Sequence, residues 1–392
     1  MKFKCTRYQF KDLASFRYGK MPNKKKISSN GLYPIYSGYR YVGYYDEYNI
    51  EPKQLIVVAR GVGGTGDVKI IKERCYLTNL SIAVEITAYD KVVPEYLYYL
   101  FALNNLRYLD SGSAQSQITI NDLEKVSISL PDIIIQRKIV DILSALDDKI
   151  ETNTAINKNL EEQAQAIFKS WFIEAKNRDT WKTGTFSDII ESTLGGDWGK
   201  EYSVGNYTEK VYCVRGADIP EVRNGNKGKM PTRYILPKNF KLKRLVPDDI
   251  VVEISGGSPT QSTGRVAAIS QSLLNRYDKG MVCTNFCRAI KPRLGYSMFV
   301  YYYWQYLYEK NVFFSYENGT TGIKNLDLNG FISTEEIMLP PNDLISKFDV
   351  ICQTYFDEVF SRGLENEKLS ELRDTLLPRL MSGEIDVSDI EI

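Results

Sequence analysis

The sequence predicts an α+β fold in which two related domains, each a mixture of strands and short helices, are each followed by a long helix. The chain of 392 residues exceeds one typical domain. A series of motifs recurs after about 200 residues, and two long proline-free stretches have the periodicity of helices. We expect a pseudo-two-fold relation between the halves and an antiparallel coiled coil between the long helices.

The composition is typical of a globular protein with a hydrophobic core, because 43% of the residues are hydrophobic and 25% are charged. The N-terminal residues 1–5 lack the apolar region of a signal peptide. No apolar run reaches the roughly 18 residues that a membrane span requires. We therefore expect a cytoplasmic protein.

The chain contains no histidine. This removes the most common general base, the usual partner of a catalytic serine or cysteine, and the most common transition-metal ligand. Of the six cysteines only Cys283 and Cys287 are close in sequence, and no second pair completes a metal-binding spacing. We expect no metal site and buried, reduced thiols.

Five motifs occur twice in the same order: a Phe-x-Asp motif, an apolar run before glycines, a Thr-Asn pair, a tyrosine-rich segment and a Leu-Pro pair. The matching segments are 10–13 and 186–189, 55–58 and 249–252, 76–80 and 282–286, 96–100 and 300–304, and 130–131 and 339–340. This repeat is too long for a solenoid and predicts two homologous halves. We place the two mixed domains at residues 1–132 and 178–341.

The proline-free stretches 132–219 and 342–377 each contain a seam of residues spaced alternately by three and four. The seam residues are Leu143, Leu146, Ile150, Asn157, Leu160 and Ile167 in the first stretch, and Tyr355, Val359, Asn366, Leu369 and Leu376 in the second. The pattern predicts long helices in 133–177 and in 342–392, the latter with a C-terminal tail. Helix-to-helix packing is favoured over packing of each helix on its own domain. Asn157 and Asn366 are then expected near the middle of the seam, where a buried amide fixes the register.

Four segments together resemble the specificity (S) subunits of type I restriction–modification systems. They are Tyr-Pro-Ile-Tyr-Ser-Gly at 33–38, Leu-Thr-Asn at 77–79, Leu-Pro followed by Gln-Arg-Lys-Ile at 130–139, and the stretch 369–385 that contains Leu-Leu-Pro-Arg-Leu-Met-Ser-Gly-Glu-Ile. The resemblance covers nearly the whole chain. One departure is Ile345, which stands where the first half has Gln136, and we expect this exchange to matter little to the fold.

The resemblance implies a non-catalytic, DNA-binding subunit. Each mixed domain would be a target-recognition domain that reads one half of a bipartite double-stranded DNA sequence. The spacer helices would act as a ruler, about 58 Å long over residues 134–172, and would dock two methyltransferase (M) subunits. Restriction/translocase (R) subunits would join for cleavage. The chain itself would hold no cofactor, and S-adenosylmethionine, ATP and Mg would belong to the partner subunits.

Glycine-rich and polar loops are the candidates for DNA contact. Residues 61–66 match GxGxxG, but residues 67–72 alternate as in a strand, whereas a dinucleotide site requires a helix there. We expect a hairpin instead, with side chains that can reach base edges or phosphates. For these loops the alternatives are an ordinary surface turn and a connector before a helix. For the tyrosines of residues 36–45 we favour packing in a sheet over contact with DNA. The candidate residues are Tyr36, Ser37, Arg40, Arg60, Gly63, Gly64, Thr65, Gln115, Ser116, Gln117, Arg215, Gly257, Ser258, Gln261, Arg265, Thr320 and Thr321.

Two motifs of DNA-modifying enzymes are incomplete. Asp248 and Glu253 resemble a nuclease core, but Ser255 stands where a lysine is required, and the order in Pro-Pro-Asn at 340–342 is wrong for an amino-methyltransferase. We therefore expect no catalytic residues. The alternatives are the recognition chain of another methyltransferase-linked defence system, a self-contained DNA-modifying enzyme with unusual motifs, and a coiled-coil adaptor that binds no DNA. A net charge of only +1 requires a DNA-binding chain to gather its basic residues on one face or to rely on a partner.

Overall fold

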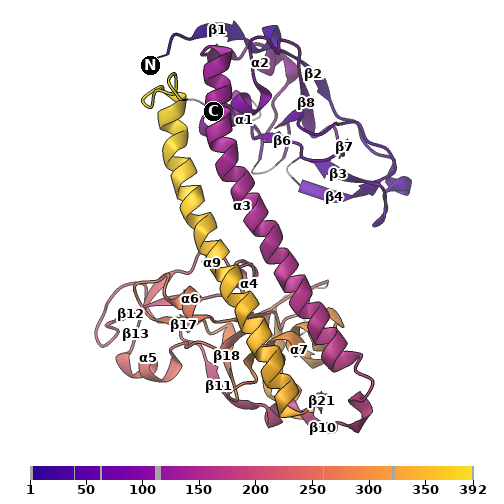
Figure 1. Cartoon of the computed structure of the whole chain (residues 1–392), viewed down its shortest axis with the longest axis vertical. Helices are drawn as coiled ribbons and strands as arrows, with labels where there is room; N and C mark the ends of the chain where they lie inside the picture. The colour runs from indigo at the N-terminus through magenta and orange to yellow at the C-terminus, as the bar shows by residue number, and fades with distance from the viewer. Residues whose placement is uncertain are drawn as a thin grey trace. The chain divides into compact units, whose positions relative to one another are not determined.

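The computed structural model describes residues 3–38, 40–61, 64–110, 116–258, 260–319 and 323–390. The chain divides into two compact units, of which the first comprises Met1–Asp148 and Ser370–Ile392 and the second comprises Lys149–Leu369. Each unit therefore contains one mixed domain and one part of each long helix (Figure 1).

The strands described in the first unit form three sheets, with strand orders β2-β8-β5-β6, β4-β3-β7 and β1-β9. All neighbours are antiparallel except β3 and β7, which are parallel. The apolar run of β5 is buried at all four positions, as a strand in the middle of a sheet requires. The strands are β1 (Thr6–Gln9), β2 (Ala14–Tyr18), β3 (Tyr33–Ser37), β4 (Arg40–Tyr45), β5 (Leu55–Val58), β6 (Val68–Ile70), β7 (Tyr76–Leu77), β8 (Ser81–Ile86) and β9 (Ser127–Leu130).

The second unit repeats these sheets, with orders β11-β18-β14-β16, β13-β12-β17 and β10-β21, and the pair β12 and β17 is again the parallel one. This agreement confirms the two homologous halves that the motifs predict. A further small sheet, β15-β20-β19, adjoins them. The strands are β10 (Lys182–Thr185), β11 (Ile190–Gly195), β12 (Glu209–Val214), β13 (Thr232–Ile235), β14 (Ile250–Glu253), β15 (Ser255–Gly256), β16 (Val266–Ala268), β17 (Met281–Cys283), β18 (Cys287–Pro292), β19 (Glu317–Asn318), β20 (Lys324–Leu326) and β21 (Glu336–Leu339).

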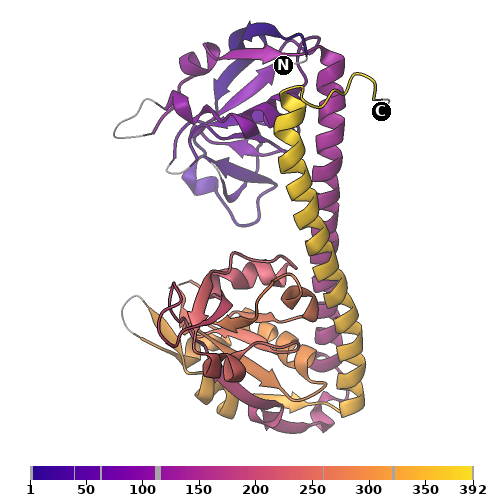
Figure 2. The ribbon, with the colours of Figure 1, turned by 90° about the vertical axis from the view of Figure 1, so that its left-hand side faces the viewer.

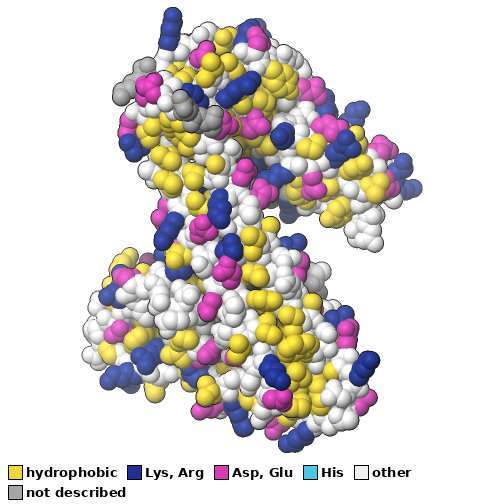
Figure 3. All heavy atoms as spheres, in the orientation of Figure 1, with side chains coloured by type: hydrophobic (Ala, Val, Ile, Leu, Met, Phe, Trp, Pro, Cys, Tyr) yellow, Lys and Arg dark blue, Asp and Glu magenta, His cyan; other side chains and the backbone are white. Residues whose placement is uncertain are grey.

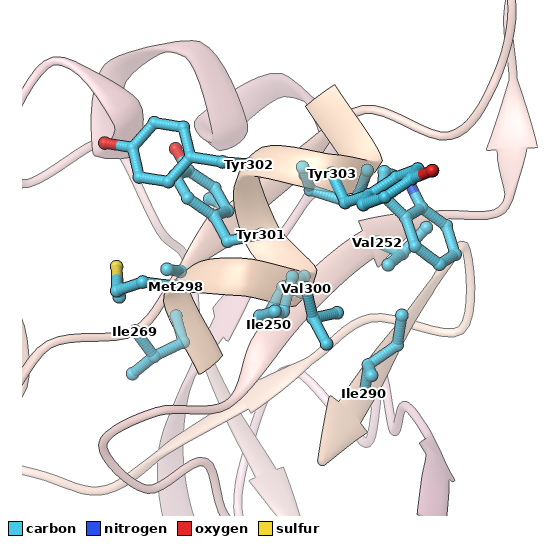
Figure 4. Close-up of a cluster of buried hydrophobic side chains, with 14 of the residues drawn as sticks. Ile250, Val252, Ile269, Ile290, Met298, Val300, Tyr301, Tyr302 and Tyr303 are labelled. Atoms are coloured by element: carbon cyan, nitrogen blue, oxygen red, sulfur yellow. The ribbon is translucent and has the colours of Figure 1, made fainter. Parts of the chain in front are cut away.

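Short helices cover the sheets. They are α1 (Pro94–Leu103), α2 (Ile120–Glu124), α4 (Ile219–Arg223), α5 (Pro237–Lys243), α6 (Gln271–Leu274), α7 (Ser297–Glu309) and α8 (Leu328–Thr334), with 3-10 turns η1 (Phe10–Asp12), η2 (Lys24–Lys26), η3 (Leu106–Leu109), η5 (Arg178–Thr180), η6 (Phe186–Asp188), η7 (Gly216–Asp218) and η8 (Val312–Tyr316). The tyrosine-rich repeats form α1 and α7. In Figure 4 the side chains of Ile250, Val252 and Ile290 lie beneath α7, so the tyrosine-rich helix covers the central sheet of the second unit.

The long helices α3 (Ile133–Phe168) and α9 (Asn342–Met381) lie side by side in Figures 1 and 2. A π-helical turn, Lys169–Ile173, follows α3. Within the second unit Asn153 bonds to Asn366, Asn157 to Val359 and Gln163 to Tyr355, so residue numbers rise along one helix as they fall along the other. The pairing is antiparallel, and none of the predicted seam residues is exposed. The prediction of two long paired helices is confirmed.

Asn157 and Asn366 both lie in the middle part of the seam, but they do not face each other. Asn366 lies opposite Asn153, one helical turn before Asn157, with the amide nitrogen of Asn153 2.9 Å from Oδ1 of Asn366. Asn157 instead donates to the carbonyl oxygens of Val359, at 3.0 Å, and Asn224, at 3.3 Å. In an antiparallel pair of related helices, two equivalent residues face each other only at the centre of the pairing. Asn157 and Asn366 are equivalent residues, and they lie a short distance from that centre. Buried amides hold the seam, each through a separate partner.

Gln136 and its counterpart Ile345 are both buried but make different contacts. Gln136 is fully buried, accepts a hydrogen bond from the Val93 amide at 3.0 Å, and donates to the carbonyls of Lys91 and Pro131 at 2.8 and 2.9 Å. Ile345 is 1% exposed and belongs to the hydrophobic core of the second unit. The position joins a mixed domain to the start of its helix in both halves, by hydrogen bonds in one and by apolar contact in the other.

We expect Gln136→Leu to lower the free energy of unfolding by about 2–4 kcal/mol, because it leaves buried backbone groups without partners. Urea denaturation of the purified chain measures this loss. Arg137→Leu, at the neighbouring exposed position of the same helix, is the matched control and should change stability by less than about 0.5 kcal/mol. Equal stability of the two variants would contradict the structural role of Gln136.

The cysteines are free thiols, and all but Cys5 are buried. Burial raises the pKa of Cys75 and of Cys213 to about 12, so both are protonated at neutral pH. Within the part of the chain that the structure describes, no group of acidic residues and cysteines could hold a metal ion. None of the helices described combines the length and the apolarity needed to cross a bilayer.

Candidate DNA interface

Two loops predicted to contact DNA lie side by side in the first unit. The turn after β5 and the polar loop before α2 meet at an isolated bridge between Arg60 and Gln117. The amide of Ile118 also donates to the carbonyl of Ala59 at 2.9 Å. The next element after this glycine-rich turn is β6, paired antiparallel with β5, which confirms the expected strand and fits no dinucleotide site.

Four of the candidate residues fall in the gaps between the described ranges, and two of their neighbours fall within those ranges. Gly63, Gln115, Thr320 and Thr321 lie outside the described residues, as does Tyr39 of the tyrosine-rich strand. Gly64 lies in the described turn after β5. Thr65 is buried, and its hydroxyl donates to the carbonyl of Gly61 at 3.0 Å, so this side chain stabilises the turn from within.

The equivalent loops also adjoin in the second unit. Between β14 and β16, Ser258 and Gln261 form a bridge, with the Ser258 amide 2.7 Å from the Gln261 carbonyl, and Gly257 precedes it with φ of +77°. In the same segment β15 pairs with β20, which places Ser255 opposite Asn325. In both units the sequence therefore brings the same two loops together at the end of the central sheet.

An acidic side chain closes the base of the polar loop in each unit. Asp110 accepts hydrogen bonds from the Ser116 hydroxyl and, at 2.8 Å, from the Gln117 amide. Glu317 accepts from the Thr263 amide at 2.6 Å and from Lys324 at 2.7 Å, and thereby ties the polar loop to the neighbouring hairpin. Sequence reasoning missed both acids. The sequence did contain a signal: each acid lies seven residues before a hydrogen-bond partner at the far end of the loop. The partner is Gln117 for Asp110 and Lys324 for Glu317.

The candidate arginines of the second unit are held by buried carboxylates. Arg215 forms two hydrogen bonds to Asp218, at 2.9 and 3.0 Å, and a third to the carbonyl of Lys229 at 2.7 Å. Arg265 forms two to Glu253, both at 2.7 Å. Direct contact with a base would require either arginine to leave its carboxylate, which costs free energy because the acids are almost fully buried.

The tyrosine-rich strands of the first unit divide between packing and exposure. Tyr36 is 7% exposed, and its ring centroid lies 5.0 Å from that of Tyr41. Burial raises the pKa of Tyr36 to about 12. The hydroxyl of Ser37 accepts a hydrogen bond from Thr78, while the side chain of Arg40 is exposed at the start of β4. Packing within the sheet, the favoured interpretation, holds for Tyr36, whereas Tyr41 is 48% exposed.

A sequence profile of the type I restriction modification DNA specificity domain matches residues 4–162. The chain is 26% identical over 334 residues to the specificity subunit of the type I restriction enzyme MjaIX of Methanocaldococcus jannaschii, which covers 77% of this chain and 71% of that protein. It is 25% identical over 363 residues to the HindI specificity subunit of Haemophilus influenzae, at 75% and 78% coverage.

The fold is also that of a solved S subunit. The crystal structure of a type I restriction–modification S subunit from M. genitalium superposes with a TM-score of 0.61, at 17% identity, and covers 97% of this chain and 96% of that chain. The chain belongs to the type I specificity subunits. It is accordingly the DNA specificity chain of such a system and its non-catalytic component.

This specificity subunit concentrates its basic residues in one segment of the second unit. Residues 200–244 contain eleven Lys and Arg but only four Asp and Glu, although the net charge of the whole chain is +1. Lys238, Lys241 and Arg244, on and just after α5, are exposed. Figure 3 shows Lys and Arg side chains gathered at the lower left, where Figure 1 places α5. Basic side chains gathered in this way suit a phosphate backbone.

Aromatic side chains accompany this basic segment. The guanidinium of Arg233 lies 3.9 Å from the centre of the Trp198 ring, and Lys200 lies 5.7 Å from that of Tyr207. Tyr202 is 72% exposed. Arg215 is the one candidate from the sequence that lies in this segment, because the net charge of the whole chain hides the local excess of basic residues. A count over short windows would have found the segment.

The loop-closing Glu317 should make the stability of the second unit sensitive to acid. Burial raises its pKa, but hydrogen bonds from Lys324 and Thr263 outweigh this effect and hold the pKa below its ordinary value of 4.5. A depressed pKa means that the stabilisation is complete above the unfolded value and is lost as the pH falls through the folded value. We expect Glu317→Gln to lose less stability than the wild type between about pH 5 and about pH 3, as measured by urea denaturation. Parallel acid profiles of the two proteins would contradict this assignment.

Proposed function

We propose that this specificity subunit reads a bipartite double-stranded DNA sequence, one half with each mixed domain. The domains are those at residues 1–132 and 178–341, and the long helices lie in 133–177 and 342–392. The observation that carries the proposal is that both units present the same pair of adjoining loops on the same arrangement of sheets. Two related reading surfaces on one chain correspond to two separate half-sites.

The side chains at these loops suit base and phosphate recognition. Ser116, Gln117, Ser258 and Gln261 offer hydroxyl and amide groups that can donate to and accept from base edges. The exposed basic residues of 200–244 supply contacts to phosphates, which position a duplex without reading its sequence. Arg215 and Arg265 would support the loops while they keep their carboxylates.

The long helices would dock two methyltransferase subunits. Apolar side chains on both helices are exposed, among them Ile134 at 60% and Val350 at 68%, and such residues are typical of a surface that a partner covers. Restriction/translocase subunits would join the assembly for cleavage. S-adenosylmethionine, ATP and Mg would act in these partner subunits.

Methylome sequencing of cells that carry the complete system, with and without the gene for this chain, tests the proposal. We expect one two-part motif with an unread gap, and its loss when the gene is removed. A single uninterrupted motif, or a motif that persists without the gene, would overturn it. Methylation of duplex DNA by the purified chain alone with S-adenosylmethionine would instead identify a self-contained enzyme.

A further inference from the structure

The second unit contains a segment that the first lacks. Strands β3 and β4 of the first unit are joined by residues 38 and 39, whereas the equivalent strands β12 and β13 are joined by residues 215–231. This longer connection contains η7 and α4, followed by residues 224–228, which we call the clasp loop. The asymmetry is unexpected between halves that have three sheets of the same strand arrangement in common.

The clasp loop lies against both long helices within the second unit. The amide nitrogen of Asn157, on α3, donates to the carbonyl of Asn224 at 3.3 Å. On the side of α9, a Cβ atom added to Gly225 would lie 2.4 Å from the carbonyl oxygen of Val359, and one added to Gly363 would lie 1.9 Å from that of Gly225. Backbone therefore packs directly on backbone, and only glycine fits at either position.

A partly buried ion pair holds the clasp loop in place. Arg276 donates to the carbonyl of Gly225 and to the carboxylate of Glu367, both at 2.7 Å, and its side chain is 5% exposed. Lys227 lies 3.6 Å from the same carboxylate. Burial raises the pKa of Glu367, but the pair with Arg276 outweighs this and keeps the pKa below its ordinary value. The acid is therefore charged at neutral pH.

The remaining sides of the loop are fixed to the mixed domain. The hydroxyl of Tyr277 donates to the carbonyl of Lys227 at 2.6 Å. Just before the loop, Arg223 hydrogen-bonds to Gln305 of α7 and lies 3.8 Å from Glu161 of α3. The loop thus has the segment just after α6 (Gln271–Leu274) on one side and the helix pair on the other, so a rotation of the domain on the helices would break these contacts together.

We infer that the clasp loop fixes the angle at which the second mixed domain stands on the helix pair, and thereby restricts the enzyme to one gap length between the half-sites. This inference rests on the proposed bipartite recognition. One base pair adds about 3.4 Å to the gap and turns the next half-site by roughly 35° about the duplex axis, so a reading domain must change its angle to align with a neighbouring gap length. Gly363, Gly225 and Arg276 are positioning residues, since they act through the orientation of the domain.

The test compares the methylomes of cells that carry the complete system with wild-type, Gly363→Ala or Arg276→Met chains. Gly195→Ala is the matched control, because a Cβ there would meet only the end of the Arg288 side chain, at 3.7 Å. We expect the two clasp variants to keep both half-site sequences and to methylate sites with gaps one base pair longer or shorter. The ratio of methylation at the original gap to that at neighbouring gaps should fall about tenfold, the equivalent of ~1.4 kcal/mol.

A purely structural role predicts a different result, in which total methylation falls while the gap stays unique. That outcome in both clasp variants would overturn the inference. Should either variant fail to accumulate as folded protein, Glu367→Gln keeps the volume of the side chain and carries the same expectation. Absence of any bipartite motif with the wild-type chain would instead refute the proposed function, so the two failures are distinguishable.

Discussion

Insertion of four residues into each long helix, after Asp148 and after Leu369, is expected to lengthen the gap between the half-sites by about one to two base pairs. Four helical residues add about 6 Å, and each base pair adds about 3.4 Å. The insertion points lie where the chain passes from one compact unit to the other, and the one in α9 follows Glu367 without separating it from Val359 and Gly363. Both half-site sequences should stay unchanged, because neither set of reading loops is altered.

Methylome sequencing measures the new motif directly. Sites with the original gap should lose methylation, since their binding falls toward the nonspecific level, which is typically weaker by at least about a thousandfold. An insertion in only one helix is the control. It leaves the antiparallel seam mismatched beyond the insertion and should lower the melting temperature, whereas the paired insertion should largely preserve it. A changed half-site sequence in the paired variant would contradict the modular organisation.

The repeated fold and the paired helices could be predicted because both depend on spacing along the chain. A buried strand such as β5 needs a continuous apolar run, and the run at 55–58 recurs at 249–252. A helix seam needs apolar residues at alternating intervals of three and four, and both stretches keep that pattern. The register of the seam could not be predicted, since several displacements of an antiparallel pair bury comparable surface.

The roles of individual polar residues depended on partners distant in sequence. In the sequence Arg265 stands in a glycine-rich turn with no acidic residue beside it. In the structure Glu253, twelve residues earlier, accepts two hydrogen bonds from it. Arg276 is separated from Glu367 by 91 residues. A glycine within a helical pattern, such as Gly363, often has a packing reason, but only the fold shows which loop lies against it.

Replacement of Lys238, Lys241 and Arg244 by alanine is expected to weaken binding to every duplex to a similar degree. Each lost phosphate contact lowers the slope of log affinity against log salt by about 0.9, so the triple variant should lose close to three units of slope if all three residues contact phosphates. The preferred sequence should be unchanged, because phosphate contacts position a duplex but carry no direct sequence information.

Fluorescence anisotropy of the assembled complex, with specific and random duplexes over a range of salt concentrations, separates these effects. The matched control replaces Lys158, Lys182 and Lys347, which are exposed lysines outside the basic segment. If this control reproduced the loss of slope, net charge alone would account for the effect.

An unchanged slope in the Lys238, Lys241 and Arg244 variant would mean that α5 does not face DNA. A loss of slope confined to that variant would assign the phosphate contacts to this surface, because local charge acts over about 10 Å at ordinary ionic strength.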